Sequence, residues 1–490
     1  MTYLGTQRGR ICNMQHWSII EEIDTSLNAP EAFEHFKDRP YSFFLDSGMD
    51  KQKLGRYSFM GGDPFLVFRS RGRDVELIRE GHVECLDGNP FDILDGLLAK
   101  YKIENESMPM PFAGGAVGYL SYDLCHFIER LPAMAVDDLD LPECYFGFYD
   151  AAVAYDHLEN KVFLISTGFP EEGEAREAKK AARFVELKQR LRGAIPPNGK
   201  TSREINVGIG VNFTHQQYLN AVQTCREYIM AGDIFEVNLS QRFNADLPFR
   251  PYELYRRLRA LNPAPFACYL GFEGVDIVSA SPERFIKLTG DMVETRPIKG
   301  TRPRGMTFVE DEAIARELTS SYKDRAENVM IVDLERNDLG RVCCYGSVNV
   351  SELLVLEKYA TVFQLVSTIE GQLREDKNCI DLLKATFPGG SITGAPKVRS
   401  MEIIDELEPT KRSVYTGNIG YIGFNGDLDL NIAIRTFIVK DGRVYFQVGG
   451  AVTYDSDPQA EYIETLDKAK ALLMALDIVP DMAKEAGQAT

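Results

Sequence analysis

The stretch that decides the fold class is residues 419–448, which read IGYIGFNGDLDLNIAIRTFIVKDGRVYFQV. It contains three runs rich in β-branched and aromatic residues: 419–424, 430–439 and 443–448. Asn425-Gly426 and Asp441-Gly442 lie between the runs, and such dipeptides are strong signals for β-hairpins. The stretch therefore predicts a three-stranded antiparallel meander. Strands that follow one another, and do not alternate with helices, favour an α+β fold.

Helical patterns lie on both sides of this stretch. Residues 213–232 begin with a capping box formed by Thr214 and Gln217, and they end at Gly232. A last helix is expected to begin at Asp457-Pro458. Its buried face is predicted to contain Tyr462, Leu466, Ala469, Leu473 and Leu476.

Before residue 200 the sequence predicts mostly strands. These are residues 41–45, 64–69 and 151–166. A charged helix is expected at 171–191, and residues 194–202, rich in Pro, Gly and Ser, are the best linker candidate. We therefore expect an N-terminal part, residues 1–200, and a second part, residues 205–480.

The composition excludes several classes of protein. The 490 residues include 55 Lys and Arg against 73 Asp and Glu, which gives a net charge of −18. Such an acidic chain is not expected to bind nucleic acid or an anionic membrane surface. No apolar run approaches the roughly 18 residues of a membrane span, and the start of the chain has no signal-peptide pattern. Nine scattered cysteines indicate neither a zinc site nor a disulfide framework, so we expect a reduced, cytoplasmic protein.

Several carboxylates are candidates for chemistry. The last of the six histidines is His215, so a site in the second half must use lysine, carboxylates or a metal. If residues 326–341 are helical, Glu327 lies on an apolar face and must be paired or bind a cation. Glu461 and Glu464 are spaced i,i+3 and would share one face. With Glu327 they would suit Mg²⁺, although acids that complement a helix dipole are the simpler reading.

Two further segments are rich in glycine or in basic residues. Residues 387–397, FPGGSITGAPK, form a glycine-rich loop that either binds an anion at a helix N-terminus or makes a tight packing turn. Residues 296–304, RPIKGTRPR, contain four cations. Lys299 is a possible nucleophile if its pKa is lowered, but a solvated basic loop is the default reading. Arg435, expected within a strand, must be paired if buried, and a ligand carboxylate is one partner.

Taken together, these segments resemble one family, the chorismate-utilising enzymes. The resemblance is carried, in the family's order, by PIKGT (297–301), ENVMIVDLERND (327–338), FPGGSITGAPKVRSMEIIDELEP (387–409), GNIGYIGFNGDLD (417–429), IAIRT (432–436) and DSDPQAEYIET (455–465). It extends more weakly to FFLDSG (43–48), GRYSF (55–59) and NPAPF (262–266). The resemblance implies two large antiparallel β-sheets packed as one composite core, with helices around them.

Within the family, the segment at 297–301 points to one reaction. Anthranilate synthases typically read PIAGT there, whereas aminodeoxychorismate synthases read PIKGT, as this chain does. The resemblance thus implies that chorismate and ammonia give 4-amino-4-deoxychorismate, for p-aminobenzoate and folate biosynthesis. A separate glutamine amidotransferase subunit would supply the ammonia. Lys299 would add to the ring at C2 and expel the C4 hydroxyl, with Glu283 as general acid. The rivals are an anthranilate synthase and a non-catalytic protein that binds chorismate or tryptophan.

The resemblance also assigns binding roles. Glu327 and Glu464 would hold Mg²⁺, with Glu461 close or bound through water. The predicted substrate-binding residues are Gly300, Thr301, Ser391, Tyr415, Arg435, Gly449 and Gly450. Three positions depart from the usual pattern, namely Glu236 in place of Gln, Gln364 in place of His, and Ala451 in place of Gly. A pocket for tryptophan near residues 45–47 and 262–266 is a further possibility of this resemblance.

Overall fold

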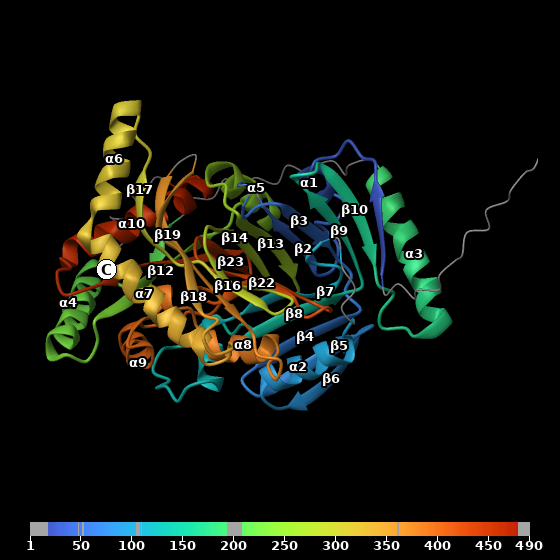
Figure 1. The fold of residues 1–490 in the computed structure, drawn as a ribbon, viewed down its shortest axis with the longest axis horizontal. Helices are drawn as coiled ribbons and strands as arrows, with labels where there is room; N and C mark the ends of the chain where they lie inside the picture. Colours follow the sequence, from blue (N-terminus) through green and yellow to red (C-terminus); the bar gives the residue numbers. More distant parts are fainter. Residues whose placement is uncertain are drawn as a thin grey trace, which may run out of the picture.

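The computed structural model describes residues 18–478 apart from 48, 51–52, 104–107, 109, 194–207 and 360–361. The expected linker at 194–202 lies outside the described residues. Two antiparallel sheets of 12 strands each form the centre of the molecule (Figure 1). They confirm the predicted α+β fold with two large sheets.

The strands of the two sheets are as follows. The first sheet has the order β1 (Ile19–Ile23), β10 (Lys161–Ser166), β9 (Ala151–Asp156), β3 (Tyr57–Gly61), β2 (Ser42–Asp46), β13 (Phe266–Phe272), β14 (Val275–Ser281), β23 (Thr436–Lys440), β24 (Arg443–Val452), β12 (Glu236–Asp246) and β11 (Gly210–Val211), with β20 (Gly394–Ala395) also paired to β12. The second has the order β17 (Ile298–Pro303), β19 (Val362–Gln372), β16 (Met292–Thr295), β15 (Arg284–Thr289), β22 (Leu428–Ile432), β21 (Asn418–Gly423), β7 (Gly115–Leu120), β8 (Cys144–Tyr149), β4 (Leu66–Arg71), β5 (Asp74–Arg79) and β6 (His82–Asp87), with β18 (Asn349–Lys358) paired to β19.

The sheets pack face to face because successive side chains of a strand point to opposite faces. Phe43 of β2 belongs to the core between the sheets, where its ring lies 4.5 Å from that of Tyr149 of β8. Its neighbour Phe44 points to the outer face, where it stacks at 5.0 Å on Phe33. The same alternation makes three apolar layers: one between the sheets and one on each outer face.

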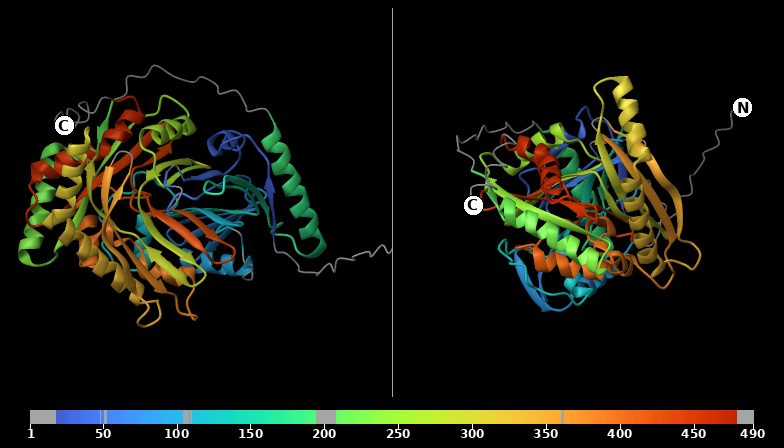
Figure 2. Two further views of the ribbon diagram at one scale, coloured as in Figure 1. Left: turned by 45° about the horizontal axis from the view of Figure 1, so that its top comes forward. Right: turned by 90° about the vertical axis from the view of Figure 1, so that its left-hand side faces the viewer.

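Helices cover the two outer faces. The helices are α1 (Ala29–Phe33), α2 (Pro90–Lys100), α3 (Gly173–Arg192), α4 (His215–Ala231), α5 (Pro251–Leu261), α6 (Phe308–Ser320), α7 (Tyr322–Gly340), α8 (Cys379–Thr386), α9 (Lys397–Leu407) and α10 (Pro458–Ala475), with short 3₁₀ turns η1 (Tyr122–Phe127) and η2 (Gly390–Ile392). Helices α1, α4, α5 and α10 pack on the first sheet, and α2, α7 and α8 on the second. Figure 2 shows α10 beside α4 and the long α3 at the other end of the molecule.

The local helix signals are confirmed. Thr214 caps α4 through a capping box with Gln217, and Gly232 ends this helix in the left-handed region, with φ +85°. Asp457 caps α10, whose predicted apolar face is buried. Among the described helices, none combines the length and apolar character that a membrane crossing requires.

The prediction of a three-stranded meander is wrong. Both hairpin turns exist, but residues 430–439 are divided between β22 in the second sheet and β23 in the first. The chain crosses from one sheet to the other between these strands, and Arg435, at the crossing, has a φ of +51°. Periodicity detects an extended run but does not say which sheet it joins, so the break could not be seen in the sequence.

Both sheets contain strands from either side of residue 200. In the first sheet β2 pairs with β13, and in the second β7 pairs with β21. The two parts thus share both sheets and the apolar layer between them. The proposed boundary itself falls beside the undescribed residues and stays a prediction.

Candidate active site

Lys299 lies on a β-bulge at the edge of the second sheet. Ile298 pairs with Val366 and Thr301 with Gln364, so two residues of β17 face a single residue of β19. Gly300 fills the bulge with a φ of +80°, where a Cβ would lie 2.9 Å from Asp324 Oδ1. A bulge redirects the side chains beside it. The solvated basic loop is therefore the wrong reading of residues 296–304.

The bulge leaves the Lys299 ammonium group in a buried ion pair. Its Nζ lies 2.7 Å from Oε1 of Glu236, the first residue of β12, and the residues are 8% and 1% exposed. Burial lowers the pKa of Lys299, but the charges of Glu236 and Glu327 outweigh it, so the net pKa is raised. The ion pair and the raised pKa favour the ammonium form of Lys299, whereas a ready nucleophile requires a lowered pKa.

Glu283 is a buried acid beside the same strand. It lies between β14 and β15, is 5% exposed, and its Oε1 accepts a 3.3 Å hydrogen bond from Ile298 N. Burial raises the pKa of Glu283 to about 7, although Ser391 of η2 donates to its carboxylate. A carboxyl group that holds a proton near neutral pH suits the role of general acid.

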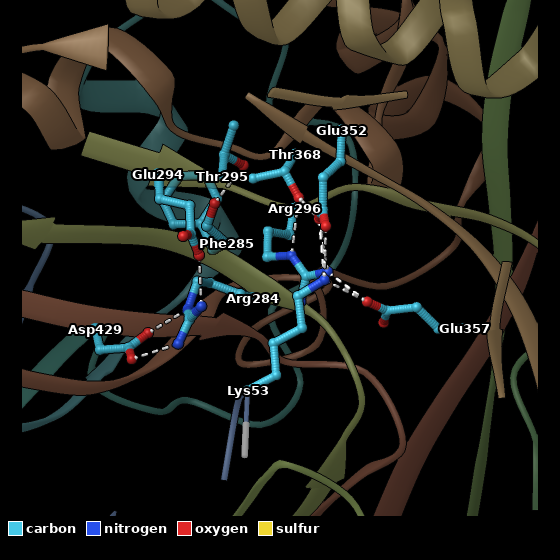
Figure 3. Close-up of polar contacts among 10 residues, drawn as sticks. All are labelled: Lys53, Arg284, Phe285, Glu294, Thr295, Arg296, Glu352, Glu357, Thr368 and Asp429. Atoms are coloured by element: carbon cyan, nitrogen blue, oxygen red, sulfur yellow. Dashed lines mark hydrogen bonds and ion pairs between the residues drawn. The ribbon is translucent and has the colours of Figure 1, made fainter. Parts of the chain in front are cut away.

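The residues that flank these two groups are fixed by ion pairs (Figure 3). Arg284, which follows the candidate acid, binds Asp429 with two 2.9 Å contacts. Arg296, on the segment that leads to β17, donates to Glu357 at 2.6 Å. Lys53 of the N-terminal part reaches the same Glu357 carboxylate at 2.9 Å. Pairing of buried cations with specific acids holds both backbone segments in place.

Arg435 is a partly buried cation without an acidic partner among the described residues. Its guanidinium donates to Asn262 Oδ1 at 3.1 Å, and among the described residues no carboxylate pairs with it. Burial alone lowers its pKa. The side chain is partly buried, so a guanidinium without a counter-ion carries a cost in the free protein, and a ligand carboxylate would supply the missing charge.

The predicted metal-binding acids lie on α7 and α10. Glu461 accepts a 2.6 Å hydrogen bond from Ser456 on Oε1, while its buried Oε2 has no partner. Glu327 Oε1 is also buried without a hydrogen bond. A Cβ on Gly450 would lie 3.2 Å from Glu461 Oε2 and 3.6 Å from Glu464 Oε1, so this glycine leaves room beside both acids. Unpartnered carboxylate oxygens around free space suit a hard cation.

These acids do not form a complete metal site in this state. Among the described residues, no group of three His, Cys, Asp or Glu side chains is arranged to hold a metal ion. Lys323 lies 3.8 Å from Glu327 Oε1, and its charge also acts on Glu461 and Glu464. Glu464 Oε1 is paired with Lys468 Nζ at 2.8 Å. Because the free oxygens of Glu327 and Glu461 fit Mg²⁺ while the assembled set is missing, the Mg²⁺ site stays a prediction.

The glycine-rich loop at 387–397 packs tightly against its neighbours, and its alternative role in binding an anion stays a prediction. Lys397 is engaged within the protein, because its Nζ binds Asp338 at 2.5 Å and the carbonyl oxygens of Thr386 and Pro388. At Gly394, with a φ of +146°, a Cβ would lie 2.2 Å from Glu236 O. Ser400 Oγ donates to the same oxygen at 3.0 Å. The loop thus clamps the start of β12, which carries the partner of Lys299.

Replacement of Gly394 by alanine should be costly because it combines a backbone clash with left-handed geometry. We expect a loss of about 2 kcal/mol or more in the free energy of unfolding, measured by urea titration. Gly426→Ala is the matched control, since Gly426 also has a positive φ, +89°, but open space around it. It should cost roughly 1 kcal/mol. Equal losses in both variants would disprove the clamp.

The other predicted substrate-binding residues are spread around this centre. Thr301 is exposed on β17, opposite the buried Gln364. Gly449 and Gly450 lie on β24, opposite β12. Tyr415 is buried beside Arg412, and no hydrogen bond joins it to Arg435 in the described part of the chain. Their contacts with a substrate stay predictions.

One buried acid, Glu335 of α7, was not singled out from the sequence. Its Oε2 lies 2.9 Å from Thr295 Oγ1, which also lies 2.7 Å from Phe285 O. A hydroxyl has one hydrogen and a carbonyl oxygen can only accept, so a protonated Glu335 satisfies both contacts. Burial raises the pKa of Glu335 to about 8, which agrees with a neutral carboxyl group.

Glu335→Gln should change the pH dependence of stability. The carboxyl group binds its proton more tightly in the folded chain, with a pKa of about 8 against 4.5. Its contribution is therefore complete below about pH 4.5 and is lost as the pH rises through about 8. Relative to wild type, the variant should gain about 1.4 kcal/mol for each pH unit between these values. Urea titrations near both limits measure this gain, and a pH-independent difference would contradict it.

Comparisons with known proteins identify the family. A family model described as chorismate binding enzyme matches residues 42–474. The chain belongs to the chorismate-binding enzymes. It is 40% identical over 467 residues to anthranilate synthase component 1 of Acetivibrio thermocellus, covering 93% of this chain and 94% of that protein. It is also 40% identical over 440 residues to aminodeoxychorismate synthase component 1 of Bacillus subtilis, covering 89% and 92%.

A solved structure supports the same family. Anthranilate synthase component I from Streptococcus pneumoniae is 33% identical and has a TM-score of 0.76, covering 86% of this chain and 93% of that one. The comparisons confirm the predicted family and fold. Because relatives with two different reactions are equally similar, they support a chorismate-utilising enzyme without selecting one reaction.

The three residues of this chorismate-binding enzyme that differ from the usual family pattern lie on strands around Lys299. Glu236 binds its ammonium group directly. Gln364 is buried on β19, next to the bulge. Ala451 of β24 pairs with Asn238 of β12. Figure 1 shows that β12, β17, β19, α7 and α10 gather at one end of the molecule.

Proposed function

We propose that this chain is an aminodeoxychorismate synthase component I, which converts chorismate and ammonia to 4-amino-4-deoxychorismate. The observation that supports the proposal is the placement of Lys299, a buried lysine on a bulge, with Ile298 N beside it donating to the buried acid Glu283. An anthranilate synthase has no use for a nucleophile at this position. The product would serve p-aminobenzoate and folate biosynthesis in the cytoplasm.

The reaction follows from these two groups. The Lys299 nitrogen forms a bond to ring carbon C2, the ring double bonds shift, and the C4–O bond breaks. Glu283 gives its proton to the departing hydroxyl, which leaves as water. Ammonia then attacks C4, the ring double bonds shift back, the C2–N bond to lysine breaks, and the proton lost from the new amine returns to Glu283. The enolpyruvyl group is kept, so no pyruvate is released.

Binding of chorismate is assigned to the charged groups around the site. Arg435 would bind one carboxylate, together with Tyr415 and the backbone at Gly449 and Gly450. Thr301 and Ser391 would line the same pocket, beside Gly300. Mg²⁺ would neutralise the other carboxylate when bound, and Glu327, Glu461 and Glu464 would hold it.

Removal of divalent cations should abolish turnover. With EDTA present we expect no product, because a buried substrate carboxylate would face the acids of α7 and α10 without a cation between them. Added Mg²⁺ should restore the rate. Isothermal titration should show Mg²⁺ binding to wild type and weaker binding to Glu464→Gln. Full turnover in EDTA would contradict the metal assignment.

A glutamine amidotransferase partner would supply the ammonia. In vitro, free ammonium should make this partner unnecessary. The decisive assay contains the purified chain, chorismate, Mg²⁺ and ammonium, with products analysed by mass spectrometry. A chorismate-derived amine that keeps its enolpyruvyl group is the expected product. Anthranilate with pyruvate would establish the second candidate, anthranilate synthase, which the 40% identity to such an enzyme favours. If no product forms even after an amidotransferase is added, the result would favour a non-catalytic binding protein.

A further inference from the structure

The ion pair between Lys299 and Glu236 has no role in the reaction described above. Glu236 is a carboxylate where the family resemblance leads one to expect the neutral Gln. Its Oε1 is 2.7 Å from Lys299 Nζ, and its buried Oε2 has no hydrogen-bond partner in the described part of the chain. A buried carboxylate is costly unless it faces a cation, so the lysine and the acid stabilise each other's charges.

We propose that Glu236 holds Lys299 as an ammonium ion in the resting site and accepts its proton before the amine acts as a nucleophile. In that step one Nζ–H bond breaks and one Oε1–H bond forms, and two charges become two neutral groups. The proton returns to Lys299 when ammonia displaces the lysine from the ring. The consequence for amination rests on the proposed function, but the protonation of Lys299 does not.

The geometry explains why the ion pair with Glu236, and not burial, determines the protonation state of Lys299. The backbone of Glu236 is fixed by its pairing with Ala395 and by Ser400, which fixes the point from which its carboxylate reaches Lys299. The charged groups that act on Lys299 or lie beside its bulge are Glu236 of β12, Glu283 before β15, Asp324 and Glu327 of α7, and Glu464 of α10. Lys323 acts on Glu327. Of these, only Glu236 forms a hydrogen bond with Nζ among the described residues.

Competitive labelling with trace acetic anhydride, read by mass spectrometry without chorismate, tests the proposal directly. Only a neutral amine is acetylated, so labelling reports the protonation of each lysine. In the wild-type protein Lys299 should reach half-maximal labelling at a higher pH than Lys470, an exposed lysine. Burial alone would give the opposite order, which would overturn the proposal even if no variant folded.

Variants then separate charge from structure. Glu236→Gln keeps the size and an acceptor oxygen, and it should move the Lys299 midpoint down by about one pH unit or more, which is at least tenfold more labelling below the midpoint. Glu236→Asp keeps the charge and should hold the midpoint above that of Lys470. Glu335→Gln removes a nearby buried acid that is already neutral, and it should leave the midpoint unchanged. An unshifted midpoint in Glu236→Gln, or an equal shift in Glu335→Gln, would refute the role of Glu236.

The same variants distinguish this inference from the proposed function. If amination occurs, kcat/KM should depend more steeply on pH near neutrality in Glu236→Gln than in wild type, because the variant must release the Lys299 proton to solvent whereas wild type passes it to Glu236. If labelling behaves as expected but no aminated product is found, the ion pair is confirmed and the proposed function fails.

Discussion

Lys299→Ala is expected to abolish the formation of aminodeoxychorismate. Removal of the nucleophile that opens the reaction should lower the rate by roughly 10³-fold or more. Ammonia would then meet the ring without a lysine adduct at C2, so a low rate of anthranilate formation with pyruvate release should appear. Mass spectrometry of the products and an enzymatic assay for pyruvate measure both changes.

The matched control for this variant is Lys470→Ala. Lys470 is exposed on α10 and pairs with Asp467. Its loss should leave both the rate and the product unchanged. The assignment of the nucleophile would be wrong if Lys299→Ala still produced an amine with an intact enolpyruvyl group at a rate near that of wild type.

Arg435→Met should weaken chorismate binding without destabilising the free protein. The guanidinium is partly exposed and has no carboxylate partner in the described part of the chain, so its removal breaks no ion pair in the free protein. Chorismate, however, would lose a charged partner worth about 2–5 kcal/mol, which is roughly 10²-fold or more in KM. Steady-state kinetics give the KM, and thermal unfolding without ligand gives the stability.

Arg284→Met is the matched control, because Arg284 is a buried arginine that is paired with carboxylates. Arg284 binds Asp429 and Glu294 at distances of 2.6–2.9 Å, so its loss strands two carboxylates. It should cost about 3–5 kcal/mol of stability. The account of Arg435 would be contradicted if Arg435→Met were as destabilised as Arg284→Met, or if its KM were unchanged.

The sequence predicts what local interactions determine. The capping box at Thr214, the turn at Asn425-Gly426 and the cap at Asp457 depend on residues close in the chain, and all three are confirmed. The division of residues 430–439 between two sheets depends on distant strands and escaped prediction. Arg435 was expected within a strand for the same reason, although it lies at the crossing, with a φ of +51°.

The sequence predicted which residues belong to the site, but it did not predict which of them contact one another. The motifs pointed to Lys299, Glu283 and the three acids proposed to bind a metal, but the contact of Lys299 with Glu236 joins positions 63 residues apart. No periodicity or spacing reports such a pair. The role of the loop at 387–397 could not be predicted for a different reason. A glycine that permits close packing and a glycine that lets the backbone approach an anion are the same residue in the sequence.

The central claim, that Lys299 attacks chorismate and expels the C4 hydroxyl, is tested most directly by trapping the adduct. The protein is incubated with chorismate and Mg²⁺ without ammonia or glutamine, denatured, digested and analysed by mass spectrometry. The account predicts a peptide containing Lys299 whose mass is increased by one chorismate less one water, and no such peptide in Glu283→Gln. An unmodified Lys299 in a preparation that aminates chorismate when ammonium is added would contradict it.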